Sequence, residues 1–245
     1  MNYIRINMKI PTIHGFIDRR ILVNFTANPE DVQRILPAKF RPKLVSGKAV
    51  VGICLIRLKQ IKPKGFPAFM GVSSENGAHR IAVEWDTENG IAEGVYIPRR
   101  DSSLALNALL GGRVFPGRHH LTRFDVRESG SSYHVEFTSK DQTHISIDAE
   151  ETDALPADSI FRSIDEASDF FKGGAAGYSP NQNKLDGLLL DAYNWTVRPL
   201  AVSQVRSSFF EDKAVFPEGS VKFDNALLMR NVEHEWRTLE QFECK

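Results

Sequence analysis

The pattern of apolar and polar residues predicts a chain built mainly from antiparallel β-strands. Residues 79–85 and 91–97 flank a short polar segment, whose Asn-Gly pair is the preferred turn for a two-stranded hairpin. Residues 119–126 and 133–139 flank a second turn, rich in serine and glycine. Runs of β-branched and aromatic residues predict further strands at 20–26, 40–45, 48–58, 142–150, 188–193, 196–206 and 220–229.

Three short helices are expected beside these strands. Residues 28–37 begin with Asn-Pro and two acids and end at a proline, as short amphipathic helices do. Residues 102–110 are apolar at helical spacing and precede a Gly-Gly pair. Residues 163–173 open with Ser-Ile-Asp-Glu, which fits a capping box. Residues 175–186, with a proline and several asparagines, are expected to form a loop.

No low-complexity segment or linker separates these elements. We therefore predict one domain over residues 1–245, of the α+β class and mainly antiparallel β, with a few short helices. Many short strands in this order are typical of a sandwich or of a curved, barrel-like sheet.

Composition and charge exclude several classes of function. The chain has 245 residues, with 31 Lys+Arg and 31 Asp+Glu, so no net field draws it to nucleic acid or to an acidic membrane surface. The longest apolar run, residues 49–56, is too short to cross a bilayer, and residues 1–20 lack the apolar core of a signal peptide. Two cysteines give no disulfide framework. We expect a cytoplasmic protein that uses no cofactor. The sequence leaves open whether the protein forms a homo-oligomer.

The first candidate site residues lie in residues 94–101, Gly-Val-Tyr-Ile-Pro-Arg-Arg-Asp. Pro98 has no amide hydrogen to give to a central ladder, so the strand is expected to end there. Neighbouring side chains of an extended chain point to opposite faces. One of Arg99 and Arg100 is therefore expected to enter a cavity beneath, and two solvated arginines at a strand end are the alternative.

Three further candidates come from the segments nearby. His119 and His120 are adjacent, so on a strand they face opposite ways and cannot chelate a metal as a pair, and no metal site is expected. One of the two is expected to point inward as a hydrogen-bonding or acid–base group. Glu75 lies in a turn-rich segment before a strand, where its carboxylate can lean over a cavity mouth, and a solvated loop glutamate is the alternative.

The order of these motifs resembles a known superfamily. The segment Gly-Val-Ser-Ser-Glu-Asn-Gly at 71–77 and Tyr-Ile-Pro-Arg-Arg at 96–100 are similar in spacing to the Glu-bearing segment and Pro-Lys-Lys motif of acetoacetate decarboxylase. Five further segments carry a second resemblance. They are Val-Phe-Pro-Gly-x-His-His (114–120), Gly-Tyr-Ser-Pro (177–180), Arg-Ser-Ser-Phe-Phe (206–210), Ala-Leu-Leu-Met-Arg (226–230) and His-Glu-Trp (234–236). With them, nearly the whole chain resembles the uncharacterised bacterial YqjF-like family of that superfamily. The resemblance implies a curved sheet or barrel around a cavity.

One departure from the decarboxylase limits the chemistry. There, a lysine of the Pro-Lys-Lys motif forms an imine with the substrate, and its cationic neighbour lowers the pKa of its amine. At the matching positions this chain has Arg99 and Arg100, and a guanidinium stays protonated and offers no amine for an imine.

Two functions remain open from the sequence. The first is an enzyme for a small anionic carbonyl or carboxylate compound. An arginine would grip the anion and Glu75 would move a proton. The second is a non-catalytic small-molecule-binding or structural protein.

Overall fold

The structure is a computed structural model that describes residues 11–104, 117 and 119–243. Its described residues form one sheet of thirteen strands. The strands are β1 (Ile13–Ala27), β2 (Arg41–Pro42), β3 (Leu44–Val45), β4 (Lys48–Pro63), β5 (Val72–Thr87), β6 (Gly90–Ser102), β7 (His119–Ser129), β8 (Ser132–Ser139), β9 (His144–Glu151), β10 (Ala176–Asn181), β11 (Lys184–Ala192), β12 (Arg198–Ser207) and β13 (Val221–Glu243). Most neighbours run antiparallel, and β6 pairs in parallel with β7 and β10. The predicted class, mainly antiparallel β, is confirmed.

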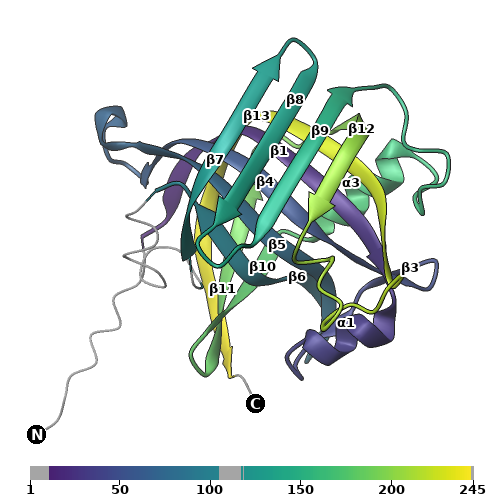
Figure 1. Ribbon diagram of the computed structural model, residues 1–245. Coiled ribbons are helices and arrows are strands. Elements are labelled where there is room, and N and C mark those ends of the chain that lie inside the picture. Colours follow the sequence, from purple (N-terminus) through teal and green to yellow (C-terminus); the bar gives the residue numbers. More distant parts are fainter. Residues whose placement is uncertain (1–10, 105–116, 118, 244–245) are drawn as a thin grey trace, which may run out of the picture.

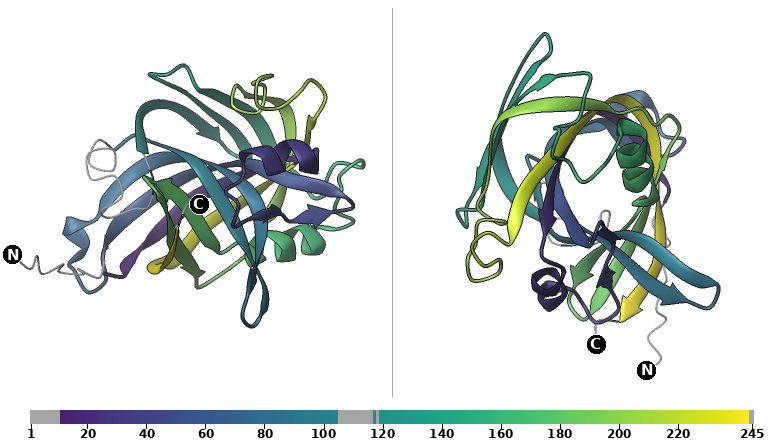
Figure 2. Two further views of the ribbon diagram at one scale, coloured as in Figure 1. Left: turned by 90° about the horizontal axis from the view of Figure 1, so that it is seen from below. Right: turned by 90° about the vertical axis from the view of Figure 1, so that its right-hand side faces the viewer.

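Two extra pairings make this sheet strongly curved. The strand order is β11-β10-β6-β7-β8-β9-β12-β13-β1-β4-β5-β2, with β3 beside β4. In addition, β11 pairs with β13 and β6 pairs with β5. The pairings therefore close two rings that share β13, β1, β4, β5 and β6. One ring is completed by β10 and β11 and the other by β7, β8, β9 and β12, and the right-hand view of Figure 2 shows the resulting curvature.

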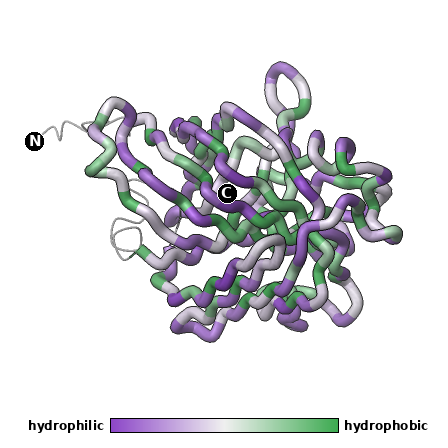
Figure 3. Tube along the Cα trace, turned by 90° about the horizontal axis from the view of Figure 1, so that it is seen from above, coloured by the Kyte–Doolittle hydropathy of each residue, from purple (hydrophilic) through white to green (hydrophobic). Residues whose placement is uncertain are grey.

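The shared strands are covered on both faces. In β1, Ile21 and Val23 belong to an apolar cluster that includes residues of β8 and β9, whereas Leu22 packs in a second cluster with Phe171 of α3 (Ile164–Gly173). Figure 1 shows β7, β8, β9 and β12 side by side, and Figure 3 shows hydrophobic and hydrophilic positions mixed along the strands. A strand buried on both faces reads as a continuous apolar run, which explains residues 49–56.

Both predicted hairpins and two of the predicted helices are confirmed. β5 and β6 form the first hairpin, and β7 and β8 the second. α1 (Pro29–Ile35) begins after Asn28, whose side chain accepts a hydrogen bond from the Glu30 amide at 2.9 Å. α3 begins after Ser163, whose hydroxyl accepts from the Glu166 amide at 3.1 Å. In the described part of the chain, no helix is long and apolar enough to cross a membrane.

Two boundary predictions are wrong for local reasons. β6 does not stop at Pro98, because this proline sits at a register shift of the β5–β6 ladder, where its missing amide hydrogen costs no regular ladder bond. The expected loop at 175–186 is instead the β10–β11 hairpin. Pro180 fits in β10 because only Gly177 and Tyr178 pair with β6. The helix expected at 102–110 lies almost wholly outside the described residues.

His79 makes the stability of this core depend on pH. Its ring is fully buried and lies 4.5 Å from the ring of Phe209, and burial lowers the pKa of His79 to about 3. Below pH 6.5 the unfolded chain therefore takes up a proton that the folded chain does not, so stability falls as the pH drops from 6.5 toward 3.

Replacing His79 should flatten that pH dependence. Between pH 7 and pH 5, the wild-type protein should lose about 2 kcal/mol more unfolding free energy than His79→Leu, as measured by urea unfolding at both pH values. Ile81→Val, a change of a buried side chain on the same strand, should lower stability equally at both. If the unfolding free energies of His79→Leu and of the wild type changed equally with pH, a lowered pKa of His79 would be contradicted.

Candidate functional site

A cavity of about 110 Å³ lies inside the ring that β10 and β11 complete. Side chains two apart on a strand share a face, and this alternation selects the lining. The residues that this alternation turns toward the cavity are Cys54, Ile56 and Leu58 of β4, Asn76, Ala78 and Arg80 of β5, and Leu188 and Leu190 of β11. Arg20 of β1, Arg100 of β6, His119 of β7 and Trp236 of β13 complete much of it. The wall is therefore apolar over a large part and carries three guanidinium groups.

The register shift at Pro98 decides which arginine of the second pair enters the cavity. Ile97 and Pro98 together oppose Arg80 of β5. One extra residue reverses the facing of the side chains beyond it. Arg100 therefore lines the cavity, and Arg99 points to the other face.

Arg99 is held by two carboxylates, Asp141 and Asp101, and Asp101 also borders the cavity. The Arg99 Nε and Nη2 each lie 2.8 Å from the Asp101 carboxylate, and its Nη1 lies 2.5 Å from Asp141. The Asp101 carboxylate is fully buried and also accepts from Ser139 and Thr122, at 2.8 and 3.1 Å. The Arg99 guanidinium holds the pKa of Asp141 well below its usual range. Arg99 thus acts as a structural cross-link between β6 and the end of β8.

The consecutive arginines of β1 are divided in the same way. Arg20 lines the cavity. Arg19 is 1% exposed on the opposite face, where Nη2 lies 2.6 Å from Glu75 and Nη1 lies 2.7 Å from Glu128. Each arginine pair thus supplies one cation to the cavity and one to a carboxylate network.

The structure places Glu75 apart from Arg100. Glu75 lies within β5 rather than in a turn, and its carboxylate binds Arg19 and also Arg57, at 2.5 Å. Its neighbour Asn76 lines the cavity instead. The expectation that Glu75 leans over the cavity is corrected, because strand alternation turns its side chain toward the arginines of the opposite face.

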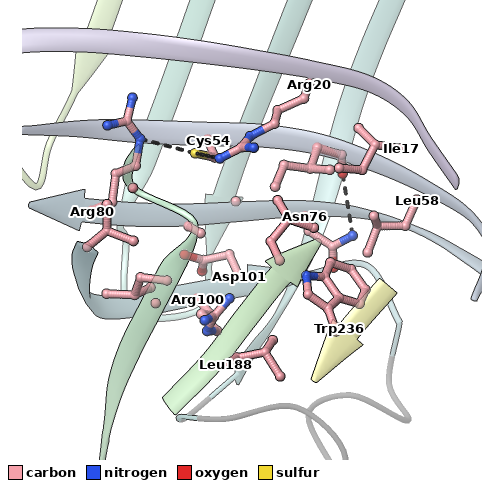
Figure 4. A pocket seen from close by; sticks show the side chains of 18 of the residues that line it. Ile17, Arg20, Cys54, Leu58, Asn76, Arg80, Arg100, Asp101, Leu188 and Trp236 are labelled. Carbon is pink, nitrogen blue, oxygen red and sulfur yellow. Dashed lines mark hydrogen bonds between the residues drawn. The ribbon is translucent and has the colours of Figure 1, made fainter. Parts of the chain in front are cut away.

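The three cavity arginines have few protein partners. Arg20 Nη2 and Arg80 Nε lie 3.5 and 3.1 Å from the Cys54 sulfur, and Arg100 Nε donates to the Ser179 hydroxyl at 3.2 Å. Figure 4 shows Cys54 between Arg20 and Arg80, with Arg100 on another strand near Asp101. Burial lowers the pKa of Arg100 to about 10, so it remains a cation at neutral pH.

The two candidate histidines occupy different surroundings. His119 lines the cavity. The side chain of His120 is 42% exposed, and its Nδ1 lies 3.8 Å from Asp141. Among residues 11–104, 117 and 119–243, no group of three or more His, Cys, Asp and Glu side chains could hold a metal ion.

Sequence reasoning selected Arg100 and His119 but missed Arg20, Arg80 and Cys54. One signal was available, because Arg19-Arg20 repeats the arginine pair of β6 at the start of another predicted strand. Arg80 and Cys54 lie in runs that read as ordinary buried strand, so only the fold reveals that they meet.

The chain belongs to the family DUF2071, described as an uncharacterized conserved protein, which matches residues 17–229. No curated protein sequence matches the chain.

Solved structures confirm the predicted resemblance at the level of fold. An acetoacetate decarboxylase-like enzyme from Sphingomonas wittichii RW1 has a TM-score of 0.58 at 10% identity, covering 97% of this chain and 94% of that one. The acetoacetate decarboxylase of Legionella pneumophila has a TM-score of 0.56 at 11% identity, with coverages of 96% and 90%. The enduracididine biosynthesis enzyme MppR has a TM-score of 0.59 at 12% identity, with coverages of 97% and 91%.

Arg19→Met should destabilise the protein by about 3 kcal/mol, because it removes a buried cation from between two carboxylates. Arg230→Met provides the matched control. Arg230 lies 3.4 Å from the same Glu128, but its side chain is 42% exposed, so its loss should cost less than about 1 kcal/mol. Urea unfolding at pH 7 measures both. Equal losses of unfolding free energy in the two variants would show that the burial of Arg19 adds nothing to the stabilisation by its ion pairs.

Proposed function

We propose that the chain binds a small organic anion, a carboxylate or keto acid, in the cavity lined by Arg20, Arg80 and Arg100. One observation carries the proposal: within the described part of the chain, none of these three guanidinium groups forms an ion pair with an Asp or Glu side chain. Burial of a charge without a partner costs several kcal/mol, and the carboxylate of a ligand would offset that cost through charge-assisted hydrogen bonds.

Size and polarity narrow the ligand class. An apolar cavity of about 150 Å³ accommodates benzene, so a volume of about 110 Å³ suits a molecule of no more than about six non-hydrogen atoms. The apolar wall, with Leu188, Leu190 and Trp236, favours a short carbon skeleton beside the charged end. MppR has been solved in complex with pyruvate, a keto acid of this size, which supports the proposal.

The chemistry of the site does not use an imine at the decarboxylase positions. Arg99 and Arg100 lie at the positions that the sequence resemblance matches to the lysines of that enzyme, and no lysine is found among the described residues that line the cavity. A guanidinium remains protonated and is a poor nucleophile. Arg100 instead supplies a fixed positive charge, and Glu75 takes no part because its carboxylate is bound to Arg19 and Arg57.

A thermal-shift titration with pyruvate tests this proposal. At about one hundred times its dissociation constant, pyruvate should add about 2.7 kcal/mol and raise the unfolding midpoint by about 5 to 10 °C. Acetone, which lacks the carboxylate, should give no shift. Arg100→Met should abolish the pyruvate shift.

Two variants control for the loss of positive charge. Arg127→Met changes a side chain that is 69% exposed and lies outside this cavity, and should leave the shift intact. Arg99→Met should lower the midpoint without ligand but keep the pyruvate shift. A shift that survives in Arg100→Met, or that acetone reproduces, would refute the anion site.

A further inference from the structure

Cys54 is the one cysteine of the described residues, and its place in the arginine-lined cavity gives it a chemical function. It lies in β4, is 3% exposed and forms no disulfide. Its sulfur accepts hydrogen bonds from Arg80 Nε at 3.1 Å and from Arg20 Nη2 at 3.5 Å. Both guanidinium groups lie at the same cavity wall as the sulfur (Figure 4).

Charge balance favours the anionic form of this sulfur. Arg80 is 3% exposed. Among the described residues, its guanidinium donates hydrogen bonds to the Cys54 sulfur and to the side-chain amide oxygen of Asn24. Burial alone would raise the pKa of the Cys54 thiol, but the positive charges of Arg20 and Arg80 outweigh burial and lower that pKa below its usual value. The thiolate is the nucleophilic form of cysteine.

A second observation concerns hydrogen-bond donors of Arg20, one of the two arginines beside the sulfur. The Nε and Nη1 atoms of Arg20 are buried and have no hydrogen-bond partner among the described residues. Arg100 lines the same cavity and bonds Ser179 through Nε. Guanidinium donors match a carboxylate in charge, and a keto acid bound by Arg20 would lie at the part of the cavity wall that carries Cys54.

We infer that the Cys54 sulfur adds to the carbonyl carbon of a small aldehydo or keto acid whose carboxylate is bound by Arg20 and Arg100. The sulfur supplies the electron pair of the new S–C bond. The carbonyl π pair moves to oxygen, which takes a proton from water, so the product is a hemithioacetal or hemithioketal and no oxidant is needed. The inference rests on the proposed function, because the arginines must first bind the carboxylate.

Glyoxylate labelled with ¹³C at its aldehyde carbon tests the addition. The test uses Cys244→Ser, in which Cys54 is the remaining thiol, and compares it with the double variant Cys54→Ser/Cys244→Ser. The ¹³C spectrum should show a protein-bound tetrahedral carbon attached to sulfur in the first protein and none in the second. Glyoxylate should raise the unfolding midpoint of both, because the arginines are retained.

Alkylation of Cys54 gives a second measurement. In folded Cys244→Ser, the ratio of the iodoacetate rate to the iodoacetamide rate should exceed that of the urea-unfolded protein by about tenfold, because the cavity attracts the anionic reagent. Arg20→Met should remove most of this gain. Mass spectrometry of the Cys54 peptide measures both rates.

The outcomes separate the two proposals. If glyoxylate stabilises both proteins but no sulfur-bound carbon forms, Cys54 does not add to the carbonyl carbon and the anion site stands. If neither glyoxylate nor pyruvate stabilises the protein, the anion site itself is refuted and the addition with it.

Discussion

The burial of positive charge is the physical constraint on which this structure depends. Five arginines, Arg19, Arg20, Arg80, Arg99 and Arg100, lie within or beside the shared strands of the two rings. Arg19 and Arg99 are neutralised by carboxylates. The other three face one cavity, where none of them forms an ion pair with an Asp or Glu of the described residues and two of them contact the Cys54 sulfur. Without a ligand, this excess of positive charge lowers the stability of the folded protein. The surrounding side chains pack around the arginines and hold them in place.

That packing comes from strands covered on both faces. Phe171 of α3 lies 4.8 Å from the Arg80 guanidinium, a cation–π distance, and Ala167 and Phe171 bury apolar surface against Leu22 and Ala82. On the other face, the layer of β7, β8, β9 and β12 closes over Ile21 and Val23. Arg19 and Arg80, the two of these five arginines that are fully buried, therefore cannot reach water without disrupting one of the two cores.

Local patterns predicted most of the fold but only part of the site. Hairpins and helix starts depend on a few neighbouring residues, such as Asn28 and Ser163, and were therefore readable from sequence. The division of Arg99 and Arg100 between two faces followed from strand alternation, but the choice of Arg100 depends on the register shift at Pro98, which the sequence does not specify. Glu75 was misplaced because its partners lie 56 and 18 residues away in the chain.

The most direct measurement of the central claim is a bromide soak of protein crystals, followed by an anomalous difference map. Bromide is a monovalent anion that needs no particular shape of site. An excess of positive charge in the cavity predicts an anomalous peak within hydrogen-bond distance of Arg20 or Arg100. Bromide at surface lysines and arginines only, with the cavity unoccupied by the ion, would contradict the claim that these buried cations form an anion site.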